Sequence, residues 1–228
     1  VHALVESLEY ANAPDKPFYT EVAVVSMNGM RIGVSTNTLL RDAKGNTHSE
    51  QRTAMLVPVG PETLQSSDVM HVHAMRPDAT LIRSLYVESS NSSIESQLEL
   101  QFGEDGAWHV EGKFKGKPLS ATWPGKETPS SWLEEALALR KRLTQENAEG
   151  ASFSVMQWLA SADPSTRTES KTTIGKSLGE DRVAVRQSAA GLEVDLVIEK
   201  KTGMLFSAVV PVGPSSMSIE RVYVDGSF

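Results

Sequence analysis

Two histidines at alternate positions are the residues of this sequence best suited to metal chemistry. His71 and His73 are two residues apart, and such residues point to the same side of a β-strand. Two imidazoles on one face can bind one metal ion, but a zinc site needs at least a third protein ligand. His48, Asp68 and His109 are candidates, and nothing in the sequence places them near the pair. One interpretation is a metal-dependent hydrolase that uses His71 and His73. The other is that the two histidines simply lie on a solvated strand face.

A second motif resembles the end of a phosphate-binding loop. Gly175-Lys176-Ser177 matches its last positions, but the loop also needs a glycine at position 170, where this chain has Ser170. The flanking pattern does not fit a strand followed by a helix either. The sequence therefore excludes P-loop chemistry.

The usual nucleophiles are also missing from the sequence. The chain has no cysteine, which excludes disulfides, thiolate metal sites and cysteine nucleophiles. No Gly-x-Ser-x-Gly elbow occurs. The adjacent carboxylates Glu104/Asp105 and Glu134/Glu135 are assigned to a turn and to a helix start. We therefore expect no enzyme activity, no catalytic residue and no cofactor.

The charge of the chain limits its partners. The 228 residues carry a net charge of −7, and no long run of Lys or Arg occurs. This balance argues against binding to nucleic acid or direct docking on anionic lipid, both of which require clustered basic residues. The candidate partners that remain are a protein or an apolar small molecule.

The compartment is inferred from cysteine usage and from the first residue. No stretch reaches the roughly 18 apolar residues of a membrane span. The sequence begins at Val1 without a Met, which favours a removed signal peptide. Together with the absence of cysteine, this predicts an extracytoplasmic protein, periplasmic or secreted.

Most of the chain has the pattern of antiparallel β-structure. Asn28-Gly29 predicts a tight hairpin turn between strands at 19–26 and 30–40, because both residues tolerate positive φ. Further strands are predicted at 47–57, 81–88, 94–102, 108–115, 152–160, 182–187, 192–198, 204–210 and 217–224. Trp123 fits none of these strands, and an exposed position at the rim of the sheet is one interpretation of it.

One helix interrupts the β pattern. Ser131 and Glu134 form a capping box, in which each side chain can bond the other residue's amide. Apolar residues then follow a helical period, and Gly150 can end the helix, which predicts a helix at 131–149. The fold class is thus α+β, mainly antiparallel β: a large curved sheet or open half-barrel with one long helix packed on it.

The domain organisation follows from these elements. Residues 1–17 are expected to be an irregular N-terminal segment and 18–228 a single β-rich domain. Pro-Val-Gly-Pro occurs twice after a predicted strand, at 58–61 and 211–214. The domain can therefore consist of two related β halves, 18–125 and 151–228, joined by the helix. The plainer explanation is that this motif simply ends a strand.

The order of short motifs resembles a known kind of domain. An early hairpin at 28–33, a strand with Gly112, a late Lys201-Thr202-Gly203 turn and a final strand with Arg221 occur in sequence. This layout resembles the β-rich region that precedes transglutaminase-like domains in bacterial envelope proteins, and related uncharacterised periplasmic β-sheet domains. The resemblance implies an extracytoplasmic binding module and carries over no catalytic residue.

These observations predict a non-catalytic binding or interaction module of a bacterial envelope protein. The first alternative is a carrier of an apolar ligand or lipid in the groove of a half-barrel, in which the helix acts as part of a lid. The second is the His71/His73 hydrolase.

Overall fold

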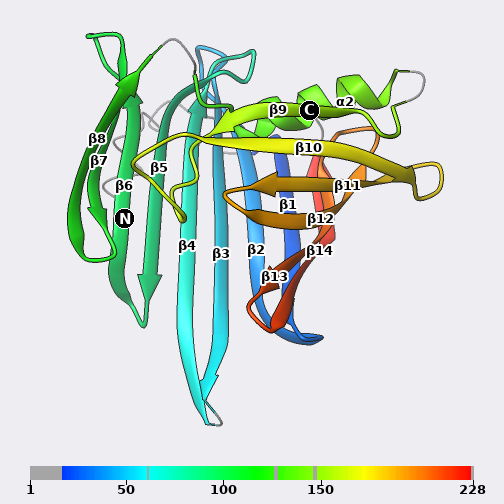
Figure 1. Cartoon of the computed structure of the whole chain (residues 1–228), viewed down its shortest axis with the longest axis horizontal. Coiled ribbons are helices and arrows are strands. Elements are labelled where there is room, and N and C mark those ends of the chain that lie inside the picture. Colours follow the sequence, from blue (N-terminus) through cyan, green and yellow to red (C-terminus); the bar gives the residue numbers. More distant parts are fainter. Residues whose placement is uncertain (1–16, 61, 126–127, 146–147, 227–228) are drawn as a thin grey trace.

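The protein is a single, strongly curved antiparallel sheet with one helix at its end (Figure 1). The computed structural model describes residues 17–60, 62–125, 128–145 and 148–226. The expected N-terminal segment 1–17 lies, except for residue 17, outside these residues. Among the described residues, α2 (Trp132–Leu143) is the one helix. The prediction of a mainly antiparallel β fold in one large sheet is confirmed, whereas the α part of α+β amounts to this helix.

The chain forms two meanders, one before the helix and one after it. The first consists of β1 (Tyr19–Met27), β2 (Met30–Arg41), β3 (Thr47–Gly60), β4 (Thr63–Met75), β5 (Leu81–Ser90), β6 (Ser93–Phe102), β7 (Ala107–Phe114) and β8 (Lys117–Pro124). After α2 (Trp132–Leu143) follow β9 (Ser152–Gln157), β10 (Thr168–Ser177), β11 (Arg182–Ala189), β12 (Leu192–Glu199), β13 (Leu205–Val212) and β14 (Ser215–Gly226).

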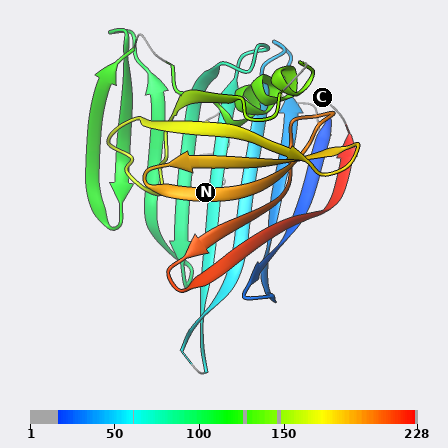
Figure 2. The same ribbon diagram turned by 45° about the vertical axis from the view of Figure 1, so that its right-hand side comes forward.

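The first and last strands join the two meanders. β1 pairs with β14 from Tyr19–Gly226 to Met27–Met217, so that β8 and β9 are the two free edges of one 14-stranded sheet. The sheet curls until β9–β12 lie across the strands of the first meander, as both views show (Figure 2). The fold is therefore a barrel-like shell that stays open between β8 and β9.

Three strands were not predicted from the sequence. β10 and most of β4 have mixed polar and apolar side chains without a clean alternation, and the alternation of β8 is limited to Leu119, Ala121 and Trp123, between two prolines. Gly175-Lys176-Ser177 is the end of β10, within a sheet and not in a loop before a helix. Trp123 lies on β8 and is buried against Trp108, so the expected rim position is wrong.

The helix begins as predicted and ends earlier. The Ser131 hydroxyl accepts from the Glu134 amide at 3.1 Å, and the Glu134 carboxylate bonds the Ser131 amide in return. The helix ends at Leu143 and not at 149, because the amide of its cap Thr144 bonds back to the Arg142 carbonyl. Gly150 does not cap it, since its amide donates to a carbonyl of β10.

The inner face of the curved sheet holds most of the core, apart from a cluster of Met70, Val72, Leu85 and Val87 on the other face of β4 and β5. A cluster with three tryptophans fills the space inside β4–β8: Met75, Ala79, Leu81, Tyr86, Leu98, Leu100, Trp108, Val110, Trp123, Leu133, Trp158 and Ala160. A second cluster lies inside β10–β12 and contains Leu139, Ile174, Val183, Val185 and Ile198. The helix contributes Leu133 to the first cluster, Leu139 to the second, and Ala136 to a third between them. Its apolar face thus closes one end of the shell.

Candidate functional site

An interior cavity lies between the two layers of the sheet, next to α2. Its volume is ≈ 330 Å³, within the range of small-molecule pockets. Residues of β1–β3 line one side, those of β9–β14 with the turn before β13 the other, and α2 one end. The apolar part of the wall consists of Ala23, Trp132, Ala136, Leu139, Phe153, Val185, Leu196, Ile198, Met204, Leu205, Phe206 and Ile219.

A carboxylate at an inward position of β1 is the centre of the polar part of the wall. In β1 the residues at odd positions point inward, and Glu21 lies between Tyr19 and Ala23, both buried. The Tyr19 hydroxyl donates to Glu21 Oε2 at 2.7 Å, and Asn37 Nδ2 donates to Oε1 at 3.3 Å. Burial, followed by the charge of Glu21, raises the pKa of Tyr19 well above its usual value, so the phenol stays a donor.

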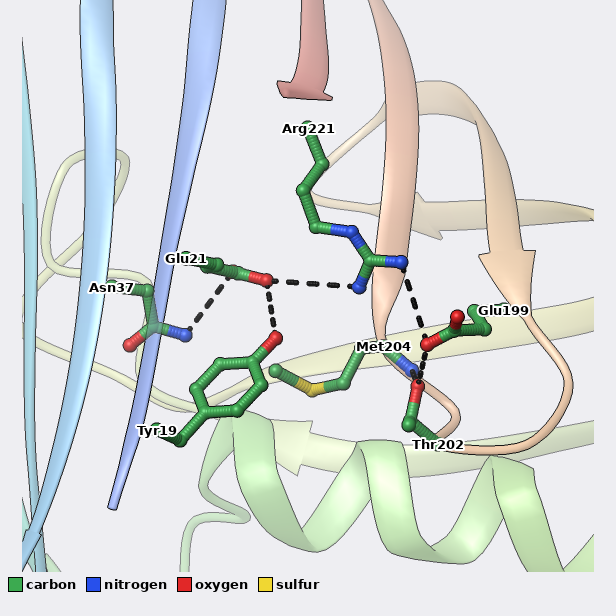
Figure 3. A network of polar contacts seen from close by, with 7 residues as sticks. All are labelled: Tyr19, Glu21, Asn37, Glu199, Thr202, Met204 and Arg221. Atoms are coloured by element: carbon green, nitrogen blue, oxygen red, sulfur yellow. Dashed lines mark hydrogen bonds and ion pairs between the residues drawn. The ribbon is translucent and has the colours of Figure 1, made fainter. Parts of the chain in front are cut away.

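The guanidinium of Arg221 joins this carboxylate to another (Figure 3). The register of β1 with β14 skips Val222, so Arg221 lies opposite Ala23 and points inward. It is 4.0 Å from Glu21 and 3.4 Å from Glu199, and its side chain is only 9% exposed. Its charge is therefore matched by two acidic groups.

Thr202 fixes the position of Glu199. Its hydroxyl donates to Glu199 Oε2 at 2.7 Å and accepts from the Met204 amide at 3.2 Å. This turn carries Gly203 and Met204, both part of the cavity wall. One network of polar contacts thus links Arg221 and Glu199 to the turn beside α2 (Figure 3).

A further carboxylate reaches the cavity from the helix. Glu135 accepts hydrogen bonds from Gln157 and, at 3.3 Å, from Gln187. Burial is the largest influence on this group and raises its pKa from 4.5 to about 7. The sequence assigned Glu135 to the helix dipole; in the fold its side chain instead turns inward between β9 and β11.

One polar atom at the cavity wall has no partner among the described residues. Asn37 is 5% exposed and lines the cavity, and its Oδ1 accepts no hydrogen bond there. The orientation of the amide is fixed, because only its Nδ2 can donate to Glu21. A buried acceptor left unpaired costs about 1–3 kcal/mol, so a donor on a bound molecule would be favourable here.

The two predicted metal ligands do lie together, but apart from this network. His71 and His73 share the inner face of β4, with ring centroids 4.2 Å apart. His71 Nε2 lies 2.9 Å from the Ser84 hydroxyl, and the ring packs edge-on against Tyr86 and Trp158. Burial lowers the pKa of His71 to about 4 and that of His73 well below its usual range. Both conditions favour uncharged, enclosed rings. The expectation that the two histidines lie on a solvated strand face is therefore not met.

The proposed third ligands are held elsewhere. His48 bonds Asp42 at 3.2 Å, His109 bonds Asp105 at 2.9 Å, and Asp68 pairs with Arg52. Within the part of the chain that the structure describes, no three His, Asp or Glu side chains are arranged to hold a metal ion. The structure thus brings together two of the residues that a metal site would need and no third.

Comparison with known proteins addresses the fold. No protein-family model and no curated protein matches the chain. A crystal structure of a β-barrel-like protein of the domain of unknown function DUF1849, from Brucella abortus, matches 91% of this chain and 96% of its own, with a TM-score of 0.66 and 11% identity. The two proteins share a fold. A DUF1089 family protein from Pseudomonas aeruginosa covers 81% of this chain and 87% of its own at a TM-score of 0.39 and 12% identity.

The similarity to the Brucella protein supports a barrel-like shell and, at 11% identity, carries no residue of a site from one chain to the other. The candidate site therefore rests on this chain alone. Sequence reasoning missed it, although one signal was present. Glu21 occupies an apolar position in the alternation of β1, and a charge at such a position indicates an inward-facing polar site.

Proposed function

We propose that this protein is a non-catalytic binding module that holds a small, mainly apolar molecule in the cavity beside α2. The observation that carries this proposal is the cavity itself: ≈ 330 Å³, walled largely by apolar side chains, with one charged network on its wall. Binding pockets typically combine an apolar lining with a few placed polar groups. This reading brings together the predicted binding module and the predicted carrier.

The proposal includes a place outside the cytoplasm of a bacterium. It is supported by the absence of cysteine and by the resemblance to periplasmic β-sheet domains. None of the described helices has the length and apolar character needed to cross a bilayer. Fractionation of cells that express the full gene, with a periplasmic marker enzyme as reference, tests the location.

A protein-binding surface is the second candidate. Val222, Tyr223 and Val224 are consecutive on β14 and all roughly half exposed, so this strand presents apolar side chains to solvent on both of its faces. Exposed apolar surface is typical of interaction sites. Filling the cavity would leave such a surface unchanged, which separates the two candidates.

The test measures binding of the neutral fluorescent probe N-phenyl-1-naphthylamine to protein from which bound apolar molecules have been removed by extraction with organic solvent. Leu196 lines the cavity, and Leu196→Trp adds bulk that must occupy it. The matched control is Leu192→Trp at the exposed start of the same strand. We expect at least about tenfold weaker binding for Leu196→Trp, because a ring in the cavity excludes the probe, and wild-type binding for Leu192→Trp.

Two results would contradict the cavity as a binding site. One is a wild-type protein that binds no probe. The other is equal affinity of the two variants, which would place the probe outside the cavity. The thermal midpoint of each variant shows whether the substituted protein is folded.

A further inference from the structure

Several hydrogen-bond donors on the cavity wall already have an acceptor. Asn37 Nδ2 donates to Glu21, and Gln187 Nε2 donates to Glu135. Trp132 Nε1 donates to the Ser49 hydroxyl at 3.1 Å. The hydroxyls of Ser35 and Thr53 bond each other at 2.9 Å. The remaining polar side chains of the wall include Gln51 and Thr172, which can both donate and accept and so select for neither kind of partner.

The acceptors on the same wall are not exhausted. Asn37 Oδ1 has no partner among the described residues, and each carboxylate can accept more than the two or three bonds it receives. A donor on a bound molecule would therefore gain a hydrogen bond. An added acceptor would face other acceptors.

The charges around the cavity favour the same kind of ligand. Glu21, Glu135 and Arg221 line the cavity, and Glu199, which does not, pairs with Arg221. The two carboxylates of the wall thus stand beside one guanidinium whose charge a third carboxylate already balances. Arg182 is near as well, with its guanidinium over the Phe206 ring, but it is exposed to solvent. An anionic group placed at this wall would lie beside carboxylates whose one inward counter-charge is already matched.

We propose that the molecule bound in this cavity presents a hydrogen-bond donor, an alcohol or an amine, to Asn37 and the neighbouring carboxylates, and that carboxylic acids of the same size are rejected. The inference deepens the proposed function and rests on it: the apolar wall holds the body of the molecule, and the acceptor-rich wall selects its polar end. It names the chemical class of the ligand.

Three molecules with the same alkyl body test the selection. Decan-1-ol, decylamine and decanoate displace N-phenyl-1-naphthylamine from the wild-type protein at pH 8, below their micellar concentrations. We expect the alcohol and the amine to displace the probe, and decanoate to need at least about tenfold higher concentration, a difference of about 1.4 kcal/mol. Equal or tighter binding of decanoate would overturn the inference.

A charge substitution tests whether Glu135 contributes to the selection. Glu135→Gln keeps the shape of the side chain and removes its acidic group, while Glu193→Gln makes the same change at an exposed position of β12. We expect Glu135→Gln to weaken the binding of decylamine and to strengthen the binding of decanoate, by a few-fold each, and to leave the binding of decan-1-ol nearly unchanged. Glu193→Gln should change the binding of none of the three. An unchanged order of the three molecules in Glu135→Gln would refute this role.

The failures of the two proposals are distinguishable. If none of the three molecules and no probe binds, the cavity is not a binding site and both proposals fail. If the probe binds and decanoate is the best competitor, the binding module stands and only the donor preference is wrong.

Discussion

At the scale of single residues, burial moves the pKa values of two kinds of side chain in opposite directions. Inside the shell, His71 is held uncharged because burial lowers its pKa to about 4. Glu135 is also favoured in its uncharged form, because burial raises its pKa to about 7. Each shift makes the free energy of unfolding depend on pH, with opposite signs.

The histidines destabilise the fold in acid. As pH falls from 6.5 toward 4, the unfolded chain takes up protons that the folded protein does not, so the free energy of unfolding falls by up to about 1.4 kcal/mol per pH unit for each histidine. We expect His71→Gln combined with His73→Gln to flatten this part of the profile, measured by urea denaturation. A profile as steep as that of the wild type would show that other groups cause the acid sensitivity.

Glu135 acts in the reverse direction. As pH rises from 4.5 to about 7, the unfolded chain releases a proton that the folded protein keeps, and the free energy of unfolding falls by up to about 1.4 kcal/mol per pH unit. Glu135→Gln should remove this loss, so that the variant gains on the wild type between pH 5 and pH 7. Glu193→Gln, at an exposed position, is the matched control and should follow the wild type.

The sequence could indicate only part of this chemistry. The spacing of His71 and His73 correctly predicts that the two rings share one face, because a strand has a period of two. The spacing says nothing about which segments lie opposite, and these bring Trp158 and not a third ligand to the pair. Glu21 and Arg221 lie near opposite ends of the sequence, and only the pairing of β1 with β14 makes them neighbours.

At the scale of elements, the contact between α2 and the turn before β13 holds the end of the shell. Gly203 has φ of +75°, and a Cβ at this position would overlap the Ala136 carbonyl oxygen of the helix. The turn can lie against the helix only because this residue has no side chain.

Two glycine substitutions test this contact. Gly203→Ala should destabilise the fold by about 2–4 kcal/mol, through the left-handed backbone and the clash with the helix. Gly213→Ala is the matched control: φ is +57°, nothing lies within 4 Å of the added Cβ, and the cost should be about 1–2 kcal/mol. Thermal or urea unfolding measures both, and equal losses would mean that the helix can move away at little cost.

Strands with a long, clean alternation could be predicted, and strands with a short alternation or none could not. β12 and β7 each show a regular pattern of apolar and polar side chains. β10 has Thr and Lys at neighbouring positions, and its buried residues include Ser170 and Thr172, so its pattern does not stand out from a loop. Such strands are stabilised by their neighbours in the sheet, which a local pattern does not contain.

At the scale of the whole molecule, the sequence predicted an open curved sheet with a helix, and the fold agrees. It could not predict how the sheet closes. The pairing of β1 with β14 joins residues 190 to 207 positions apart, from Met27–Met217 to Tyr19–Gly226. This seam places Glu21 next to Arg221 and brings the two sides of the cavity together. The two Pro-Val-Gly-Pro motifs reach the tips of the β3–β4 and β13–β14 hairpins, with Pro61 outside the described residues.

The same seam imposes an order in time on the making of the protein. A ribosome produces β1 early, and β1 then has one bare edge until β14 emerges, after every other strand has been synthesised. During that interval the unpaired edge and the unmatched Glu21 are open to other chains, as bare strand edges generally are. The first strand therefore keeps a bare edge until β14 has been made, and the cavity beside α2 is complete only when these two strands pair.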